Sequence, residues 1–169
     1  MNHSAASGEI NRSQFDFHSL AIADTRVSSL TLSTELRDTI VAFLRRCLPH
    51  EGVGLLAGRR VGSSLMADCF YPGRNIDSSP RRYTMDPADV KPALADMMHK
   101  KTRLGAIVHS HPNTSPVPSW TDLVEGRFPG VLSLIVGLSP VVELRAWYLV
   151  YDGDGVAVGC EEVPIASVF

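Results

Sequence analysis

Two histidines and an aspartate lie close together in the second half of the chain, between residues 109 and 122. Alternate residues of an extended strand point to the same side, so His109 and His111 can present two imidazoles side by side. We expect Ser110, between them, to face the other side of the strand. Asp122 can add one anionic oxygen ligand to the two nitrogen ligands. Such a set suits Zn²⁺, and three protein ligands leave one tetrahedral position open, as in catalytic zinc sites.

A hydrolytic zinc site also needs a proton acceptor, and Glu51 is the best candidate. A carboxylate near the metal can take a proton from water and pass it to a leaving amine. Glu51 lies where a predicted helix ends and an apolar strand begins, and the glycines around it permit close approach of the backbone. An acid at such a junction is either solvated or functional. Because the same chain also offers the candidate metal ligands His109, His111 and Asp122, the functional interpretation is favoured.

The segments around these residues predict the elements that position them. The apolar run 104–108 indicates a buried strand that carries the two histidines to its edge. Pro112 cannot continue a ladder, and three prolines in seven residues hold the next segment as an extended loop. Ser119 suits the N-cap of a short helix from Asp122 to about Arg127, whose dipole favours a carboxylate in its first turn.

Strand and helix patterns alternate along the rest of the chain. Strands are expected over residues 27–32, 53–57, 65–71, 131–136, 143–151 and 156–158, with a final edge strand over 161–165. Residues 59–64 predict a turn between consecutive strands. One amphipathic helix should follow its cap Ser33 and end before Pro49, and a second should begin at Asp86. Together these elements predict an α/β fold with a mixed β-sheet flanked by helices.

Size and composition indicate one domain. A chain of 169 residues with 44% hydrophobic content can bury a substantial core. Residues 1–26 are polar and lack periodicity, so we expect a flexible N-terminal extension, with residues 27–169 forming the domain.

Charge and cysteine content argue against several classes of protein. The net charge of −2, with scattered Lys and Arg, indicates neither a nucleic-acid-binding nor a membrane-surface protein. No apolar run approaches the roughly 20 residues that cross a bilayer, and the N-terminus lacks a signal pattern. Cys47, Cys69 and Cys160 are irregularly spaced and are expected to be reduced, so we expect a cytoplasmic protein.

The pattern His-Ser-His-Pro at 109–112, with Ser-x-x-Asp at 119–122 and a distant upstream Glu, resembles the JAMM (MPN+) zinc metalloprotease family in its prokaryotic branch. The resemblance implies the MPN/JAMM fold, a layout related to that of cytidine deaminases. It also implies a role for each matched residue: zinc ligands His109, His111 and Asp122, acid-base residue Glu51, and Ser119 as a donor that stabilises the tetrahedral intermediate. One departure is Val53, where many prokaryotic relatives carry Cys; it affects none of these roles.

Weaker similarity to the family lies in Asn75, in residues 79–83 and in residues 144–147. Asn75, Tyr83 and Trp120 are candidates for contacting the substrate. Trp120 could instead be a partly buried anchor, and Tyr83 could belong to an ordinary exposed loop.

The resemblance implies a substrate class. It is the C-terminal tail of a small β-grasp protein, a sulfur carrier or ubiquitin-like protein, joined by an amide to an amino acid or peptide. Only eight residues separate Asp122 from Val131, which leaves no room there for the large insertion with which some eukaryotic relatives clasp ubiquitin. A zinc amidase acting on a small molecule and a non-catalytic MPN binding scaffold stay open as alternatives. A zinc deaminase would carry a Pro-Cys-x-x-Cys ligand pair, which this sequence lacks.

Overall fold

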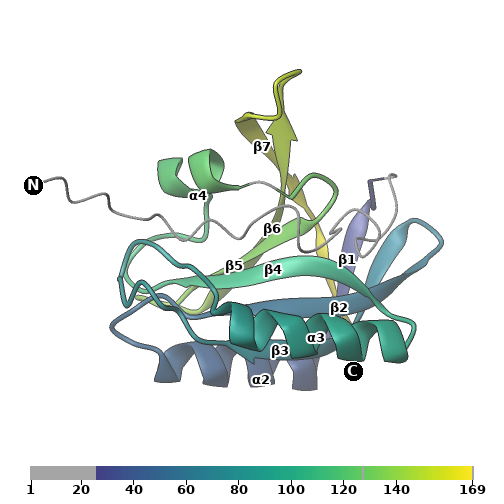
Figure 1. Cartoon of the computed structure of the whole chain (residues 1–169), viewed down its shortest axis with the longest axis horizontal. Helices are drawn as coiled ribbons and strands as arrows, with labels where there is room; N and C mark the ends of the chain where they lie inside the picture. Colours follow the sequence, from purple (N-terminus) through teal and green to yellow (C-terminus); the bar gives the residue numbers. More distant parts are fainter. Residues whose placement is uncertain (1–25, 127, 169) are drawn as a thin grey trace, which may run out of the picture.

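An eight-stranded mixed β-sheet forms the centre of the computed structural model, which describes residues 26–126 and 128–168. The strands are β1 (Ser29–Ser33), β2 (Val53–Val61), β3 (Ser64–Gly73), β4 (Arg103–His111), β5 (Leu132–Gly137), β6 (Glu143–Tyr151), β7 (Ala157–Val163) and β8 (Ile165–Val168), in the order β7-β6-β5-β4-β2-β3-β1-β8. The helices are α2 (Thr34–Arg46), α3 (Pro87–His99) and α4 (Trp120–Glu125) (Figure 1). The predicted α/β class, a mixed sheet flanked by helices, is confirmed.

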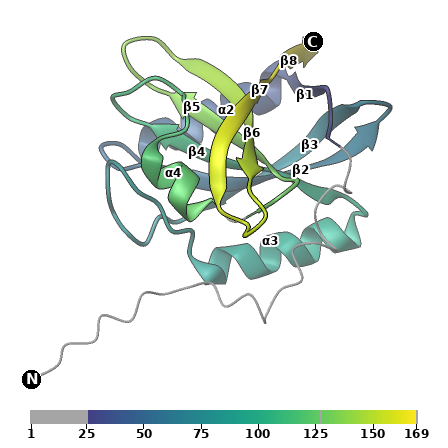
Figure 2. The same cartoon turned by 90° about the horizontal axis from the view of Figure 1, so that it is seen from above.

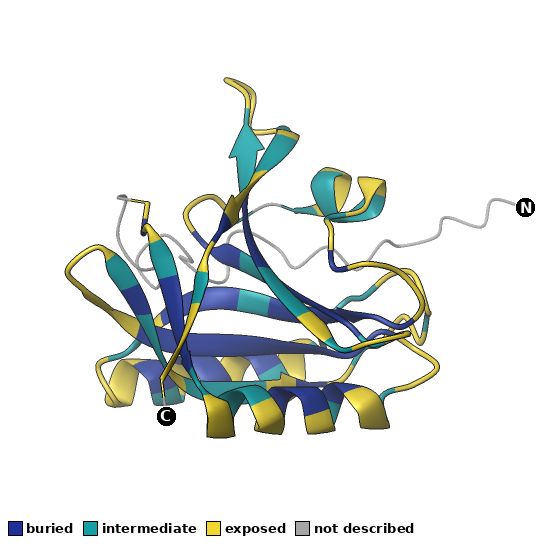
Figure 3. Ribbon diagram, turned by 180° about the vertical axis from the view of Figure 1, so that it is seen from behind, coloured by how far each residue is buried: buried dark blue, intermediate teal, exposed yellow. Residues whose placement is uncertain are grey.

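The two longer helices cover opposite faces of the central strands. Leu56 of β2 packs in the apolar cluster beneath α2, whereas its neighbours Leu55 and Ala57 pack in the cluster beneath α3. This alternation follows from the two-residue period of a strand. Figure 2 shows β2 and β4 running between α2 and α3, and Figure 3 shows that buried residues concentrate in these strands.

The caps of both long helices agree with the sequence prediction. The Ser33 side chain accepts the N–H of Leu36 at the start of α2, and the Asp86 side chain accepts the N–H of Ala88 at the start of α3. Each bond satisfies one of the free N–H groups of a first helical turn. No described helix is both long enough and apolar enough to span a membrane.

The sheet curls so strongly that its two edge strands are joined at Pro164. β7 lies at one edge and β8 at the other, yet only Pro164 separates them in sequence. The N–H of Leu30 in β1 donates to the Pro164 carbonyl (2.9 Å), and β8 then pairs in parallel with β1. Figure 2 shows this passage from β7 into β8. The expectation of one edge strand over residues 161–165 is therefore wrong, because Pro164 has no N–H and divides that segment between two edges.

Two further boundaries differ from the sequence expectations. The turn between β2 and β3 is only Gly62–Ser63 rather than residues 59–64, because residues 59–61 stay paired with β3 and Gly62 adopts a φ of 60°. Helix α4 begins at Trp120 rather than Asp122, since Ser119 caps it directly. The predicted flexible extension lies, apart from residue 26, outside the described residues.

The tight packing of β2 can be tested at Gly54. A Cβ there would lie 2.4 Å from the Phe70 ring and 2.7 Å from the Tyr71 carbonyl oxygen. We expect Gly54→Ala to lower the free energy of unfolding by about 1–3 kcal/mol, as overpacking does, in urea titrations. Gly159→Ala on β7 is the matched control, because an added Cβ there meets nothing within 4 Å. Equal effects of the two substitutions would contradict this packing.

Candidate active site

Three side chains converge where β4 ends. The Nε2 atom of His109 lies 3.3 Å from Nε2 of His111 and 3.1 Å from Oδ1 of Asp122. The Nε2 atom of His111 lies 3.3 Å from Oδ2 of the same carboxylate. The imidazoles come from alternate residues of β4 and the carboxylate from the first turn of α4. The structure thus brings together the three residues that were predicted to bind a metal, and these side chains form a group that could hold one.

The spacing of the two imidazole nitrogens fits a tetrahedral metal ion. The edge of a tetrahedron is about 1.6 times the bond from its centre, so bonds of about 2.0–2.1 Å require ligand atoms about 3.3–3.4 Å apart. The two imidazole nitrogens, 3.3 Å apart, agree with that edge. The Asp122 contacts, at 3.1 and 3.3 Å, involve its two different oxygens, Oδ1 and Oδ2. The Nδ1–H of His111 donates to the Ser115 carbonyl (2.8 Å), so a metal could take the lone pair of Nε2.

Burial and hydrogen bonding set the protonation of the group. Burial lowers the pKa of His109 and so favours the neutral imidazole that metals bind. Burial also lowers the pKa of His111, but its bonds to Asp122 and Ser115 outweigh this effect and leave that pKa raised. Although burial alone raises the pKa of Asp122, hydrogen bonds from His109, His111 and Ser119 hold it well below its usual range. Asp122 is therefore anionic.

Ser119 fixes the orientation of the Asp122 carboxylate. Its Oγ accepts the Asp122 N–H (3.2 Å) and donates to Oδ2 (2.6 Å), and its own N–H donates to the same oxygen (2.6 Å). This reciprocal arrangement is a capping box. The predicted cap is confirmed. The role of Ser119 as a donor to the substrate stays a prediction.

Glu51 reaches the metal group through the register between β2 and β4. Val53 pairs with His109, and just before β2 the N–H of Gly52 donates to Ser110 Oγ (2.8 Å) while the Ser110 N–H donates to the Gly52 carbonyl (3.0 Å). Directly opposed residues of antiparallel strands point to the same face. Extending this register by one residue beyond the pair Gly52–Ser110 places Glu51 opposite His111.

The environment of the Glu51 carboxyl suits acid-base chemistry. The residue is only 5% exposed. Burial raises its pKa to about 7; His111 opposes this rise and Asp122 adds to it. A group whose pKa lies near the working pH can both accept and release a proton.

The three residues predicted to contact the substrate occupy different positions. Trp120 is 80% exposed beside the metal group, so its alternative interpretation as a partly buried anchor is wrong. The Tyr83 ring instead packs against His109, with ring centroids 4.6 Å apart. The Asn75 side chain bonds to the backbone of Glu51. Substrate contact by these residues stays a prediction.

Two hydrogen bonds that hold the site in place were not predicted from the sequence. The buried indole of Trp147 donates its N–H to the Pro116 carbonyl (2.8 Å) and so holds the proline-rich loop that follows β4. The Ser115 carbonyl orients His111. A buried Trp needs an acceptor for its N–H, but the sequence offers no sign of which carbonyl it finds.

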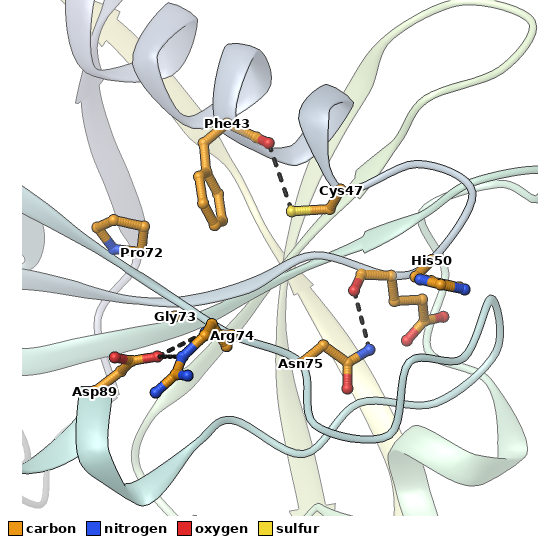
Figure 4. Close-up of a pocket in the computed structure, with 9 residues that line it drawn as sticks. Phe43, Cys47, His50, Pro72, Gly73, Arg74, Asn75 and Asp89 are labelled. Atoms are coloured by element: carbon orange, nitrogen blue, oxygen red, sulfur yellow. Dashed lines mark hydrogen bonds and ion pairs between the residues drawn. The ribbon is translucent and has the colours of Figure 1, made fainter.

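An open pocket of about 510 Å³ adjoins Glu51 (Figure 4). It lies between the C-terminal end of α2 and the start of α3. Its lining residues are Phe43, Cys47, His50, Glu51, Pro72, Gly73, Arg74, Asn75 and Asp89. One side is apolar, and the other carries the hydrogen-bonded pair Arg74 and Asp89. Glu51 lines this pocket, whereas His109, His111 and Asp122 do not, so the pocket does not open onto the metal group.

Comparisons with known proteins find related sequences over most of the chain. Residues 33–150 match the family described as prokaryotic homologs of the JAB domain. A desampylase of Haloferax volcanii is 32% identical over 125 residues, covering 71% of this chain and 88% of that protein. A probable TtuB-protein conjugate cleaving protease of Thermus thermophilus is 34% identical over 116 residues, covering 68% of this chain and 64% of that protein. The match thus spans less than two thirds of the Thermus protein.

Solved structures share the fold. A Desulfitobacterium hafniense protein superposes with a TM-score of 0.71 at 30% identity, covering 82% of this chain and 92% of that one. A Salinibacter ruber protein gives a TM-score of 0.57 at 24% identity, covering 80% and 90%, and supports the fold alone.

The raised pKa of Glu51 predicts a pH-dependent effect of Glu51→Gln in the metal-free protein. The neutral carboxyl is favoured in the folded state, so its stabilising contribution is complete below the ordinary pKa of 4.5 and is lost as the pH rises through about 7. Glutamine imitates the neutral form. We therefore expect the variant to have a higher Tm than the wild type at about pH 8 and a similar Tm at about pH 4, by calorimetry with a chelator.

Glu143→Gln, at an exposed position of β6, is the control and should show no such pH-dependent gain. A Glu51→Gln protein with no advantage at the higher pH would show that the Glu51 carboxyl is not held in a protonation-favouring environment.

Proposed function

Because the chain belongs to the family of prokaryotic JAB-domain proteins, we propose that it is a zinc-dependent isopeptidase of the JAMM type. Its proposed reaction is hydrolysis of an amide bond at the C-terminal tail of a small sulfur-carrier or ubiquitin-like protein conjugate. The observation that carries the proposal is the convergence of His109, His111 and Asp122 beside a buried Glu51. The names of the two relatives, a desampylase and a probable conjugate-cleaving protease, support the substrate class.

Zinc is the proposed metal. Two imidazole nitrogens and one carboxylate, brought together at the end of β4, are a typical donor set for catalytic zinc. When bound, zinc supplies Lewis-acid chemistry, which polarises the scissile carbonyl and makes water nucleophilic. Because all three candidate metal ligands are present, the donor set argues against the alternative of a non-catalytic binding scaffold that has lost them.

Glu51 is proposed to move the proton. Its carboxylate accepts a proton from the attacking water as the new C–O bond forms, and then donates it to the amine nitrogen as the C–N bond breaks. A pKa of about 7 allows both steps. Ser119 Oγ would donate to the carbonyl oxygen, an effect worth roughly 3 kcal/mol in other enzymes. That hydroxyl would turn from Asp122, which keeps its bond to the Ser119 N–H.

We also propose a cytoplasmic location, which the free state of Cys47, Cys69 and Cys160 supports. A net charge of −2 supports a partner other than nucleic acid.

Glu51→Gln tests the proposed chemistry. We expect the variant to bind zinc as the wild type does, measured by atomic absorption, and to lose roughly 10²–10⁴ of kcat because the proton carrier is gone. Activity is read by mass spectrometry on candidate β-grasp carrier proteins that bear C-terminal extensions, with and without a chelator. Glu143→Gln is the control for the charge change. Full activity of Glu51→Gln would remove Glu51 from the scheme.

Trp120 tests the proposed contact with the carrier protein. It lies one helical turn from Val124 on α4, and both side chains are exposed, at 80% and 47%. We expect Trp120→Ala to raise KM roughly tenfold, about 1.4 kcal/mol of binding, with kcat little changed. Val141→Ala removes another exposed apolar side chain and should leave both constants unchanged. A Trp120→Ala enzyme with wild-type KM would exclude this contact.

A further inference from the structure

A single amide side chain connects the backbone of Glu51 to the segment between β3 and α3. The Nδ2 group of Asn75 donates to the carbonyls of Glu51 (3.0 Å) and Arg82 (3.0 Å). Its Oδ1 accepts the N–H groups of Asp77 (3.1 Å) and Thr84 (3.1 Å). An amide offers two donor hydrogens and two acceptor lone pairs. Asn75 therefore uses its whole bonding capacity within the protein.

The segment 75–85, here called the clamp loop, contacts the site at three further points. The Ser79 carbonyl accepts the Glu51 N–H (2.8 Å). The Tyr83 ring packs against His109. Arg82 forms an ion pair with Glu125 of α4 (2.9 Å). The clamp loop thus touches the acid-base residue, a metal-group histidine and the helix that carries Asp122.

The backbone of Glu51 depends on this loop because the residue precedes β2. Strand pairing with β3 begins only at Val53. On one side, Gly52 is bonded to Ser110 of β4. On the other side, both backbone groups of Glu51 are bonded to the clamp loop, one through Ser79 and one through Asn75.

We propose that Asn75 is a positioning residue that holds Glu51 against the metal group, rather than a contact for the substrate. The inference rests on the proposed function of Glu51 as the acid-base residue. An amide with every donor and acceptor bonded internally would have to break one of these bonds to reach a substrate. A displacement of about 1 Å at a catalytic group can cost roughly a hundredfold in rate, so holding the Glu51 backbone from both sides matters for kcat.

Asn75→Asp tests the donor half of the amide without changing its shape. The variant keeps an oxygen for the N–H groups of Asp77 and Thr84 but turns an acceptor toward the Glu51 and Arg82 carbonyls. We expect kcat to fall roughly tenfold to a hundredfold, with KM and zinc content close to wild type. Thr84→Val is the matched control. It removes the Thr84–Asp77 side-chain bond (2.7 Å) of the same loop without touching Glu51, and should keep wild-type kcat.

Amide hydrogen exchange gives a second measurement that needs no activity. In Asn75→Asp, the Glu51 N–H bonded to Ser79 should exchange faster than in wild type, whereas Thr84→Val should leave it slow. The Gly52 N–H, bonded to Ser110, is the internal reference. Asn75→Ala, which adds no charge, replaces Asn75→Asp in both measurements if the carboxylate prevents folding.

Wild-type kcat in the Asn75 variant would overturn the inference, and a raised KM beside it would mark a substrate contact. Unchanged exchange of the Glu51 N–H would also overturn it. A wild-type protein inactive on every conjugate would instead overturn the proposed function, and the exchange comparison would still decide whether Asn75 holds Glu51.

Discussion

The register between β2 and β4 determines where chemistry can occur in this protein. The paired bonds between Gly52 and Ser110 hold the chain just before β2 alongside the two histidines. Because side chains alternate between the faces of a sheet, a slip of one residue would turn Glu51 away from His111. An acid from the first third of the chain and imidazoles from beyond its middle therefore share one face only while this ladder is intact.

The same cluster gives its two carboxyl groups different properties. Burial raises the pKa of both, but Asp122 also receives hydrogen bonds from both histidines and Ser119, and its pKa ends below the usual range. Glu51 has a pKa raised to about 7 by burial. Divergent pKa values in neighbouring carboxyls are typical of sites where one acid stays charged and the other exchanges protons. Asp122 is therefore anionic, whereas the Glu51 carboxyl can gain and lose a proton near neutral pH.

Local features of the site were predictable from the sequence, and features made by distant pairing were not. Alternation placed His109 and His111 on one face of β4, and the cap at Ser119 followed from residue type and spacing. The split of the last strand at Pro164 depends on closure of the whole sheet, which no local pattern encodes. The internal bonding of Asn75 likewise depends on a loop whose conformation is set by residues on both sides of it. Family likeness marked Asn75 without revealing its bonds.

A crystal structure of the zinc-loaded protein is the most direct measurement of this arrangement. We expect a single ion bound by Nε2 of His109, Nε2 of His111 and the Asp122 carboxylate, with the Glu51 carboxyl facing the open coordination position. An ion bound elsewhere, or a Glu51 side chain turned away from that position, would contradict the proposed active site.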